Sequence, residues 1–470
     1  MDRHTEVARF PRGRVAVLGA GLAGLSAADI LGSRGLSVVV LEKSQSIGGL
    51  AGTVVKDGFH FDQGPHRFHT RNDAVLSRVS RLLEGELLQL ERMSRIRLLD
   101  RYFLYPLSLS NVLKEMPLRA GAGMIGSYLW ARLRGIVAPP ADRNFEEWVV
   151  SRFGRRLYGI YFGPYTEKLW GCPPANLSSD WASQRISVPS LFGLIRETFS
   201  PGATGARSLV STFHYPRGGI GRIADAFAAR VRSYGGEIRT ACAPDSISIL
   251  EDGYRISADG SEFEADAIVS SIPVTEYTRL LGKVVTDEVR GAASDLRFRA
   301  IVFVTLRLAT RADARDHWIY TPEGFYGFNR LSIPENFDPE VSKSGCQVTF
   351  EFTCQDGDPT WVSSDTLVEE SVAGGVRLGL FSRGDVLGSV VTRQPCAYPI
   401  YDLGYDGRSG MVLDALQALP RSVTCGRQGL FRYNNMDHSI EMGEYAALEV
   451  LGEGSVKERF DWSRSTWADG

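Results

Sequence analysis

The stretch Arg14-Val15-Ala16-Val17-Leu18-Gly19-Ala20-Gly21-Leu22-Ala23-Gly24 decides the fold of this 470-residue chain. Its apolar first half predicts a buried strand, and the alanine- and leucine-rich run from Leu22 to about Arg34 predicts a helix. Gly35 ends that helix, and the apolar residues Leu36–Leu41 predict a second buried strand. A strand, a glycine-rich turn, a helix and a second strand form a βαβ unit, so we expect an α/β, doubly wound (Rossmann-type) domain.

The three glycines of the turn fit a dinucleotide-binding site. In such a site Gly19 permits the tight turn, Gly21 lets a pyrophosphate approach the backbone, and Gly24 lets the helix pack against the strand. The helix N-terminus then presents free N–H groups to the phosphates. Glu42 lies 23 residues after Gly19, where its carboxylate would bind the ribose hydroxyls and disfavour the 2′-phosphate of NADP. The predicted contacts of this piece are Gly19, Gly21, Leu22, Ala23, Gly24, Glu42 and Lys43.

Two more segments indicate FAD rather than NAD. Residues Ile47–Thr53 resemble the second glycine motif of FAD-dependent amine oxidases, and they add Gly49, Leu50 and Ala51 to the predicted cofactor contacts. Near the C-terminus, Gly426–Gly429 and Tyr433–Ser439 open the last predicted helix, whose first amides would face a flavin carbonyl. The contacts predicted there are Gly426, Arg427, Asn435, Met436, Asp437 and Ser439.

The overall composition excludes several classes of protein. Lysine and arginine number 53 against 55 aspartates and glutamates, so a nucleic-acid-binding protein is not expected. The cysteines form no CxxC and the histidines no metal-ligand spacing, so we expect no metal. The polar N-terminus lacks a secretory signal, which indicates a cytoplasmic protein. Arg132 and Arg134 interrupt the most apolar stretch, Ala120–Val137, so we expect no membrane span.

The rest of the chain predicts a second domain interleaved with the first. Residues 100–215 are helix-rich, whereas short strands between 237 and 271 return to the first sheet, and Arg299–Leu308 and Gln347–Thr353 predict strands of a mixed sheet. We therefore expect an FAD-binding domain from about 1–100, 215–275 and 400–470. A substrate domain of helices and a mixed sheet takes about 101–214 and 276–399, with the active site between the two.

The chain as a whole resembles the UDP-galactopyranose mutase branch of the FAD-dependent amine oxidase and protoporphyrinogen oxidase superfamily. Gly64–Thr70 is similar to the mutase segment that brings a histidine to the flavin, and Pro164–Gly171 resembles the Tyr-x-x-Lys-x-Trp signature. In Asp180–Ile186, Arg185 falls where the family keeps a diphosphate-binding arginine, and Ala397–Asp402 resembles its Tyr-Pro segment. The second diphosphate arginine of the family falls near residues 318–334, where Arg330 is our candidate.

This resemblance implies a sugar-nucleotide mutase. Reduced FAD would attack the anomeric carbon of a nucleoside diphosphate sugar through N5, and the adduct would open and reclose the sugar between pyranose and furanose forms without net redox change. It also implies an external flavin reductant, either NAD(P)H or a reductase. Planar arginine forks suit a diphosphate. The implied catalytic residues are His66, Arg185 and Arg330, the substrate-binding residues Tyr165, Trp170, Arg393, Tyr398 and Tyr401, and the flavin contacts of the histidine segment His66, Arg67 and Phe68.

Two other functions stay open at this point. The superfamily also contains FAD-dependent oxidases and desaturases, which act on a porphyrinogen, an amine or another natural product. A flavin-bound binding or assembly protein without turnover is the third reading. Several of these residues also have a structural interpretation. Arg185 could pair with a nearby acid, Tyr398 could belong to ordinary packing, and Lys168 and Trp170 suit core anchors at a helix end as well as a substrate site.

Overall fold

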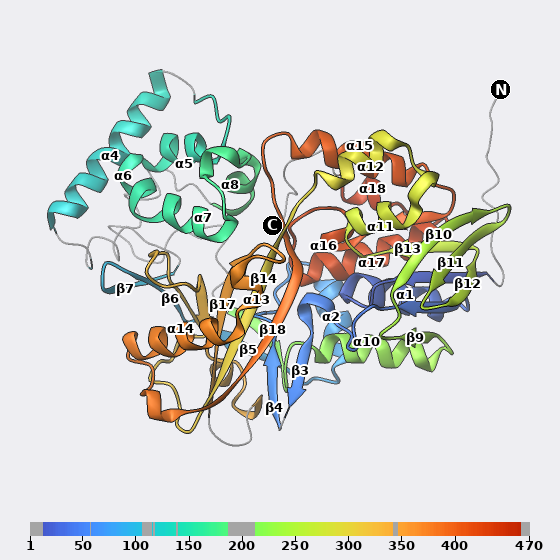
Figure 1. The fold of residues 1–470 in the computed structure, drawn as a ribbon, viewed down its shortest axis with the longest axis horizontal. Helices are drawn as coiled ribbons and strands as arrows, with labels where there is room; N and C mark the ends of the chain where they lie inside the picture. The colour runs from blue at the N-terminus through green and yellow to red at the C-terminus, as the bar shows by residue number, and fades with distance from the viewer. Residues whose placement is uncertain are drawn as a thin grey trace.

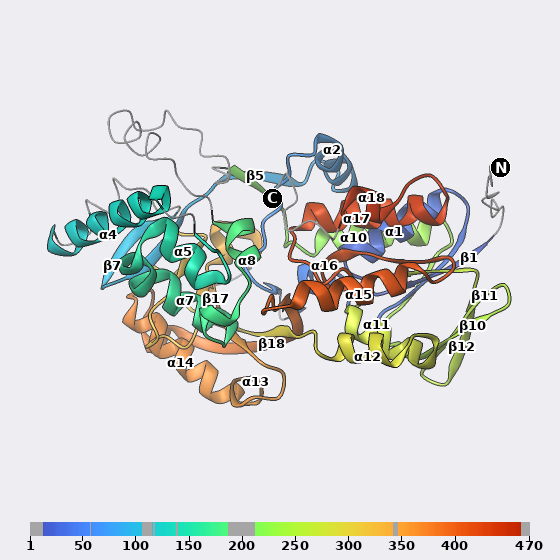
Figure 2. The same cartoon turned by 90° about the horizontal axis from the view of Figure 1, so that it is seen from above.

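The computed structural model describes residues 13–56, 58–105, 115, 118–137, 140–186, 212–341 and 346–461. Two sheets organise this part of the chain, one of five strands and one of seven. Figure 1 and Figure 2 show that the two sheets belong to two units that lie beside each other along the long axis of the molecule.

The five-stranded sheet is parallel and contains the βαβ unit expected from the sequence. Its strand order is β19-β13-β1-β2-β9. The strands are β1 (Arg14–Leu18), β2 (Ser37–Leu41), β9 (Glu237–Arg239), β13 (Ala267–Ser270) and β19 (Ser422–Thr424). Helix α1 (Leu22–Ser33) follows the glycine turn and contacts both α10 (Arg222–Ser233) and α17 (Met436–Val450). The predicted fold class is therefore confirmed.

Shorter elements complete this unit. Helices α11 (Val274–Leu281), α12 (Asp287–Ser294) and α15 (Tyr405–Gln417) pack on one another, and a three-stranded antiparallel sheet lies at the outer end of the unit in Figure 1. The remaining elements are β3 (Thr53–Lys56), β4 (Phe59–Asp62), α2 (Asp73–Leu82), β5 (Leu87–Glu91), β8 (Thr212–Pro216), β10 (Pro244–Leu250), β11 (Gly253–Ala258), β12 (Ser261–Ala265), α16 (Gly426–Gly429) and α18 (Val456–Arg459).

The seven-stranded sheet is the mixed sheet of the second unit. Its order is β18-β14-β17-β16-β15-β6-β7, antiparallel except for the β15–β6 pair. The strands are β6 (Ser94–Leu98), β7 (Arg101–Leu104), β14 (Phe298–Leu308), β15 (Trp318–Tyr320), β16 (Arg330–Ser332), β17 (Cys346–Cys354) and β18 (Val386–Pro399).

The two faces of this sheet have different neighbours, because side chains alternate along each strand. Val302, Val304 and Leu306 of β14 join the apolar cluster that α13 (Pro359–Val362) and α14 (Ser364–Arg377) cover. Ile301 and Phe303 point the other way and pack with Leu50, which comes from the first unit. This second face carries the residues of the candidate site.

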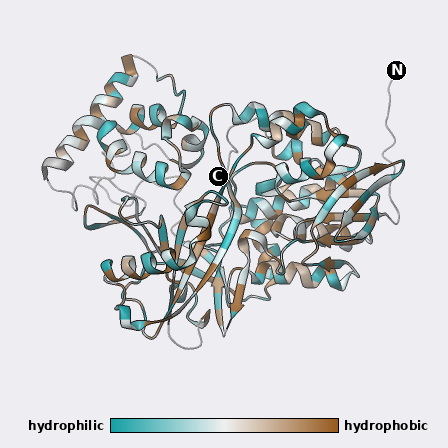
Figure 3. Ribbon diagram, viewed as in Figure 1, coloured by the Kyte–Doolittle hydropathy of each residue, from teal (hydrophilic) through white to brown (hydrophobic). Residues whose placement is uncertain are grey.

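A group of helices forms the far end of the second unit. It consists of α4 (Leu118–Val137), α5 (Phe145–Phe153), α6 (Arg155–Leu157), α7 (Gly163–Trp170) and α8 (Ser179–Arg185). Buried aromatic rings hold these helices together, among them Phe145, Trp148 and Trp170. Figure 3 shows hydrophilic and hydrophobic residues alternating along the outer helices. In the described ranges, no helix combines the length and the apolarity needed to cross a bilayer.

The chain passes between the two units several times. Strand β6 lies in the seven-stranded sheet although its residues fall within the predicted segment 1–100. Helices α11 and α12 pack on α15 although most of α11 and all of α12 fall within the predicted segment 276–399. The division into an FAD-binding and a substrate domain, with its boundaries, therefore stays a proposal.

Candidate active site

The glycine turn after β1 has the geometry that its spacing predicts. Gly19 has a φ of +95°, and its N–H donates to the carbonyl of Leu41 at 2.8 Å. A Cβ on Gly24 would lie 2.1 Å from the carbonyl oxygen of Gly19, so the helix start and the turn are in close contact. A Cβ on Gly21 would meet no atom within 4 Å, which leaves open space beside the turn.

The second glycine segment closes against this turn. Gly48 has a φ of +99°, donates its N–H to the carbonyl of Ala20 at 2.8 Å and forms a bridge with Gly21. A Cβ on Gly49 would lie 3.4 Å from the Cα of Gly21. The neighbouring Leu50 reaches the second sheet, and Ala51 is buried in the first core. The loop therefore borders the open space at Gly21.

Glu42 is fixed at the end of β2. Its Oε2 accepts the N–H of Ala20 and its Oε1 accepts the N–H of Ser44, both at 2.8 Å. These two bonds orient the carboxylate beside the glycine turn, where its remaining lone pairs are available to a ribose. Lys43, the next residue, is exposed.

The third predicted piece also reaches this turn. A Cβ on Gly426, whose φ is +82°, would lie 2.9 Å from the Cβ of Ala23. Arg427 donates to the carbonyl of Asn434 at 2.5 Å, and its guanidinium lies over the ring of Tyr433 at 4.5 Å. The start of α17 gathers the other predicted contacts: Asn435 caps the helix with His438, Met436 is its first residue, Ser439 donates to Asn434, and Asp437 Oδ1 is buried without a hydrogen bond.

His66 lies at the edge between the two units. Gly64, with a φ of +102°, allows the chain to turn beneath Phe303, since a Cβ there would lie 3.0 Å from that ring. The Nδ1 of His66 is buried and has no hydrogen-bond partner. Burial lowers the pKa of His66 to about 3, and the charges of Arg427 and Arg330 lower it further. The imidazole is therefore neutral near pH 7, so it acts as a hydrogen-bonding group and not as a cation.

Arg330 and Glu351 form an ion pair on neighbouring strands. Arg330 Nη2 lies 2.7 Å from Glu351 Oε2, and Glu351 is 4% exposed. Burial by itself lowers the pKa of Arg330, but Glu351 and the nearby phenols outweigh it and hold the pKa above its ordinary value. The Nε of Arg330 is buried without a partner. One donor of a charged guanidinium is thus left for something outside the protein.

Tyrosines line the space around Arg330. Tyr165 stacks on Tyr161 with ring centroids 5.9 Å apart and meets Tyr320 edge-on at 6.1 Å. Tyr398 stacks on Tyr433 at 5.5 Å and meets Trp170 edge-on at 6.0 Å. Burial raises the pKa of both Tyr165 and Tyr398, so both phenols are neutral hydrogen-bond donors.

Three predicted residues have mainly structural surroundings. Trp170 is 2% exposed and packs edge-on against Trp181 at 4.7 Å. Tyr401 is buried, stacks on Tyr405 at 4.2 Å, and its hydroxyl accepts the N–H of Tyr433. Phe68 is fully buried in the first core, and its N–H donates to His214. These surroundings indicate that the three residues stabilise the core and do not contact the substrate or the flavin.

Arg393 is not brought to the site. It pairs with Val302 across the sheet, and its guanidinium donates to the carbonyl of Trp361 and to Ser364 Oγ, both at 2.6 Å. Both partners belong to the helical side of the sheet, opposite Glu351. We therefore do not propose that Arg393 contacts the substrate. Arg185 ends α8, but its side chain lies outside the described residues, so its role stays the prediction made from the sequence.

Lys168 acts as an anchor for the loop that precedes Arg330. Its Nζ donates to the carbonyls of Thr321 at 2.8 Å, Glu323 at 3.2 Å and Phe328 at 2.6 Å. Burial lowers its pKa to about 7. The sequence allowed Lys168 to be either a core anchor or part of a substrate site, and these bonds support the first interpretation.

The structure adds residues to the site that sequence reasoning missed. Glu351 is the one residue of β17 with a charged side chain, and this was an available signal. The aromatic residues Tyr105, Tyr320 and Tyr433 gave no such signal, because rings are common in cores. Within the part of the chain that the structure describes, no three His, Cys, Asp or Glu side chains are placed to hold a metal ion.

Two family models match this chain. Residues 17–83 match the NAD(P)-binding Rossmann-like domain, and residues 121–366 match the flavin containing amine oxidoreductase model. The second match covers more than half of the chain.

Some individual proteins resemble a short segment of this chain, and others resemble nearly its whole length. A 4,4′-diapolycopene oxygenase from Methylomonas sp is 54% identical over 52 residues, which is 11% of this chain and 10% of that protein. The UDP-galactopyranose mutase of Mycoplasma pneumoniae is 22% identical over 448 residues, covering 93% of this chain and 95% of that one.

Solved structures with the same fold have different activities in their names. A reduced UDP-galactopyranose mutase superimposes with a TM-score of 0.84 at 22% identity, over 97% of this chain and 100% of that chain. Cyclohexylamine oxidase from Brevibacterium oxydans superimposes with a TM-score of 0.68 at 15% identity, over 94% and 99%. At such identities the likeness establishes the fold alone.

Proposed function

The chain belongs to the flavin containing amine oxidoreductase family, and from that premise we propose that it is a flavin-dependent mutase of nucleoside diphosphate sugars. The observation that carries this proposal is the site on the second sheet. There a buried, charged Arg330 keeps a donor without a partner, among tyrosines that are neutral donors. Such a site suits a polyanionic leaving group.

The described residues fit FAD, the cofactor that the family membership indicates. Space is open at Gly21, where a pyrophosphate would lie, and Glu42 is oriented beside it for the ribose. Gly49 borders the same space, and Gly426 brings the start of α16 against α1. We propose that these residues hold the dinucleotide, and that Asn435–Ser439 at the start of α17 and His66 face the flavin ring.

When bound and reduced, the flavin would supply a nucleophilic N5. The chain's own residues would then bind and orient the substrate. Arg330, with Arg185, would bind the diphosphate and stabilise its charge as it leaves, while Tyr165 and Tyr398 would donate hydrogen bonds to its oxygens. Neutral His66 would hydrogen-bond at its unpartnered Nδ1 without adding charge beside the flavin. The aromatic walls would exclude water.

A second candidate is an FAD-dependent oxidase or desaturase. The stacked rings of Tyr398 and Tyr433 already hold one cation, the guanidinium of Arg427, and aromatic faces of this kind also attract a cationic amine. The charges of Arg330 and Arg427 argue against an amine substrate. Both lower the pKa of His66, so both act on the space beside that imidazole. Like charges there disfavour a cationic substrate.

The test of the mutase proposal is a turnover assay with reduced protein. FAD-loaded protein is reduced with dithionite and incubated with UDP-galactofuranose, and the pyranose product is measured by chromatography. We expect turnover that consumes no reductant and that needs reduction by dithionite, NAD(P)H or a reductase. An enzyme that is inactive in this assay, but whose oxidised flavin is bleached by an amine or a porphyrinogen with peroxide formed in air, belongs to the second candidate.

FAD binding has its own test in a pair of glycine variants. Gly21→Ala places a methyl group in open space, so we expect the free energy of unfolding of the apoprotein to stay within about 1 kcal/mol of the wild-type value. We expect FAD binding to be lost, because the methyl group occupies the proposed pyrophosphate position. Gly24→Ala places the methyl 2.1 Å from a backbone oxygen, so we expect it to destabilise the apoprotein itself. Flavin absorbance after gel filtration and thermal unfolding separate the two. Full FAD retention in Gly21→Ala would contradict the proposed pyrophosphate position.

A further inference from the structure

Two arginines beside the site have no acidic partner. Arg67 follows His66, and its guanidinium lies over the ring of Trp318 with 5.0 Å to the centroid. Arg92 lies in the same way over Tyr105 at 5.7 Å, and its Nη1 is buried without a hydrogen-bond partner. Among the described residues, neither guanidinium has a carboxylate within ion-pair distance.

The two arginines share one wall of the site. Trp318 and Tyr320 are alternate residues of β15 and therefore point to the same side. Tyr105 lies 5.0 Å from Tyr320, and its N–H donates to the carbonyl of Ser94 on the neighbouring strand β6. Burial lowers the pKa of Arg92, and the charge of Arg67 lowers it further, so the two cations act on each other.

The charges around this space do not balance within the protein. Arg67, Arg92, Arg330 and Arg427 contribute four positive charges, and Glu351 is the one carboxylate paired with any of them in the described chain. His66 and the tyrosines are neutral. A diphosphate that joins a nucleoside to a sugar carries two negative charges, so at least one positive charge is still unmatched, and the proposed contact of Arg185 would add another. Buried charge without a counter-charge is costly, which points to an additional anionic group on the ligand.

We propose that Arg67, which the family resemblance assigns to the flavin, instead forms with Arg92 a second anion subsite that binds a carboxylate on the sugar. The inference rests on the proposed function and narrows its substrate class to nucleoside diphosphates of acidic sugars. The guanidinium carbons of Arg67 and Arg92 lie over aromatic rings, and Arg92 Nη1 has no hydrogen-bond partner, so this pair keeps at least one N–H donor for a ligand. A planar guanidinium fork suits a carboxylate.

Calorimetric titration of the FAD-loaded protein tests this subsite with three probes: UDP, UDP-galactose and UDP-galacturonate. We expect UDP-galacturonate to bind about tenfold more tightly than UDP-galactose, the difference typical of one charge-assisted contact. In Arg67→Met and in Arg92→Met the two sugar nucleotides should bind alike, while the affinity for UDP itself stays within about threefold. Arg67→Lys should keep part of the preference, and Arg311→Met should keep all of it, because Arg311 is exposed and donates to Asn336 instead.

The outcomes separate the two levels of the proposal. If UDP does not bind at all, the proposed function fails and the subsite with it. If UDP binds but wild type does not prefer UDP-galacturonate, or if the preference survives in Arg92→Met, the subsite alone is overturned. A shift in the flavin midpoint potential of Arg67→Met, without any preference between the sugar nucleotides in wild type, would assign the unmatched charge to the flavin instead. Arg92→Met replaces a half-buried side chain, so it remains informative if Arg67→Met fails to fold.

Discussion

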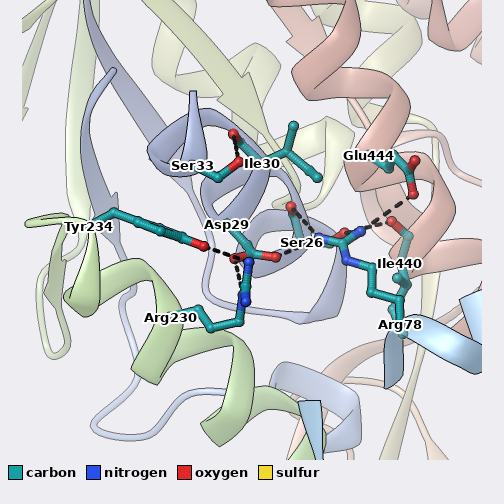
Figure 4. Close-up of polar contacts among 9 residues, drawn as sticks. All are labelled: Ser26, Asp29, Ile30, Ser33, Arg78, Arg230, Tyr234, Ile440 and Glu444. Carbon is teal, nitrogen blue, oxygen red and sulfur yellow. Dashed lines mark hydrogen bonds and ion pairs between the residues drawn. The ribbon is translucent and has the colours of Figure 1, made fainter. Parts of the chain in front are cut away.

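Two buried charge clusters in this molecule are built in opposite ways. In the first unit, Asp29 of α1 is 2% exposed and pairs with Arg78 at 2.8 Å and with Arg230 at 2.7 Å. Arg78 also donates to Ser26 Oγ at 3.0 Å, and Ser26 donates to the carbonyl of Ile440. Figure 4 shows these side chains converging from α1, α2, α10 and α17. Every charge of this Asp29 cluster has a partner within the protein.

The cluster around Arg330 lacks that balance. Arg330 has Glu351, but its Nε has no partner, and Arg67 and Arg92 lie on aromatic rings without a carboxylate. The comparison teaches that a buried charge alone does not mark a functional site. A matched cluster joins elements of the fold, whereas an excess of one sign indicates that a ligand of the opposite sign completes it.

The largest expected effect comes from breaking the matched cluster. Asp29→Ala removes the buried acid that Arg78 and Arg230 share and leaves Arg78 only the longer contact to Glu444 at 3.4 Å, so we expect the free energy of unfolding to fall by about 3 kcal/mol in a urea titration. The exposed ion pair Arg34–Glu453 serves as the control. Glu453→Ala should change the free energy of unfolding by less than about 1 kcal/mol. Equal effects of the two variants would mean that the Asp29 cluster does not hold the helices together.

The next effect concerns binding at the unmatched cluster. Arg330→Met removes the cation that would contact the diphosphate, so we expect UDP affinity to fall about 100-fold, or about 2.7 kcal/mol. The variant also leaves Glu351 unpaired, and Arg330→Met/Glu351→Gln should restore stability without restoring UDP affinity. If the double variant bound UDP like wild type, Arg330 would have only a structural role.

A smaller effect concerns a third kind of buried charge, an acid whose hydrogen-bond donors are all uncharged. Asp62 accepts hydrogen bonds from Thr53, Tyr215 and the N–H of Ile220, and burial raises its pKa to about 6. The unfolded chain therefore loses this proton at lower pH than the folded chain. Stability from this group is present below about pH 4 and is lost as pH rises to about 6.

The measurement for Asp62 is thermal unfolding as a function of pH in wild type and in Asp62→Asn. Because the asparagine does not titrate, the difference between the two proteins should change in the pH 4 to 6 window and be flat between about pH 7 and 8. A constant difference across both windows would mean that Asp62 titrates alike in the folded and unfolded chain.

Local signals were enough to predict the fold of the first unit. The glycine spacing, the apolar strands and Glu42 are close in sequence, and each restricts the backbone directly. The site on the second sheet depends on pairings between distant strands, so Glu351 opposite Arg330 was not predictable from either segment alone. The substrate contact predicted for Arg393 was an avoidable error: it lies five positions before Tyr398, an odd offset, so strand alternation already places the two on opposite faces.

The most direct test of the account is a UDP titration of FAD-loaded protein in its oxidised and dithionite-reduced states. We predict saturable binding to wild type that is tighter in the reduced state, falls as salt is added, and weakens in Arg330→Met. Wild type that carries FAD but binds no UDP in either state, or that binds it no better than Arg330→Met, would contradict the claim that Arg330 and its neighbours bind a diphosphate.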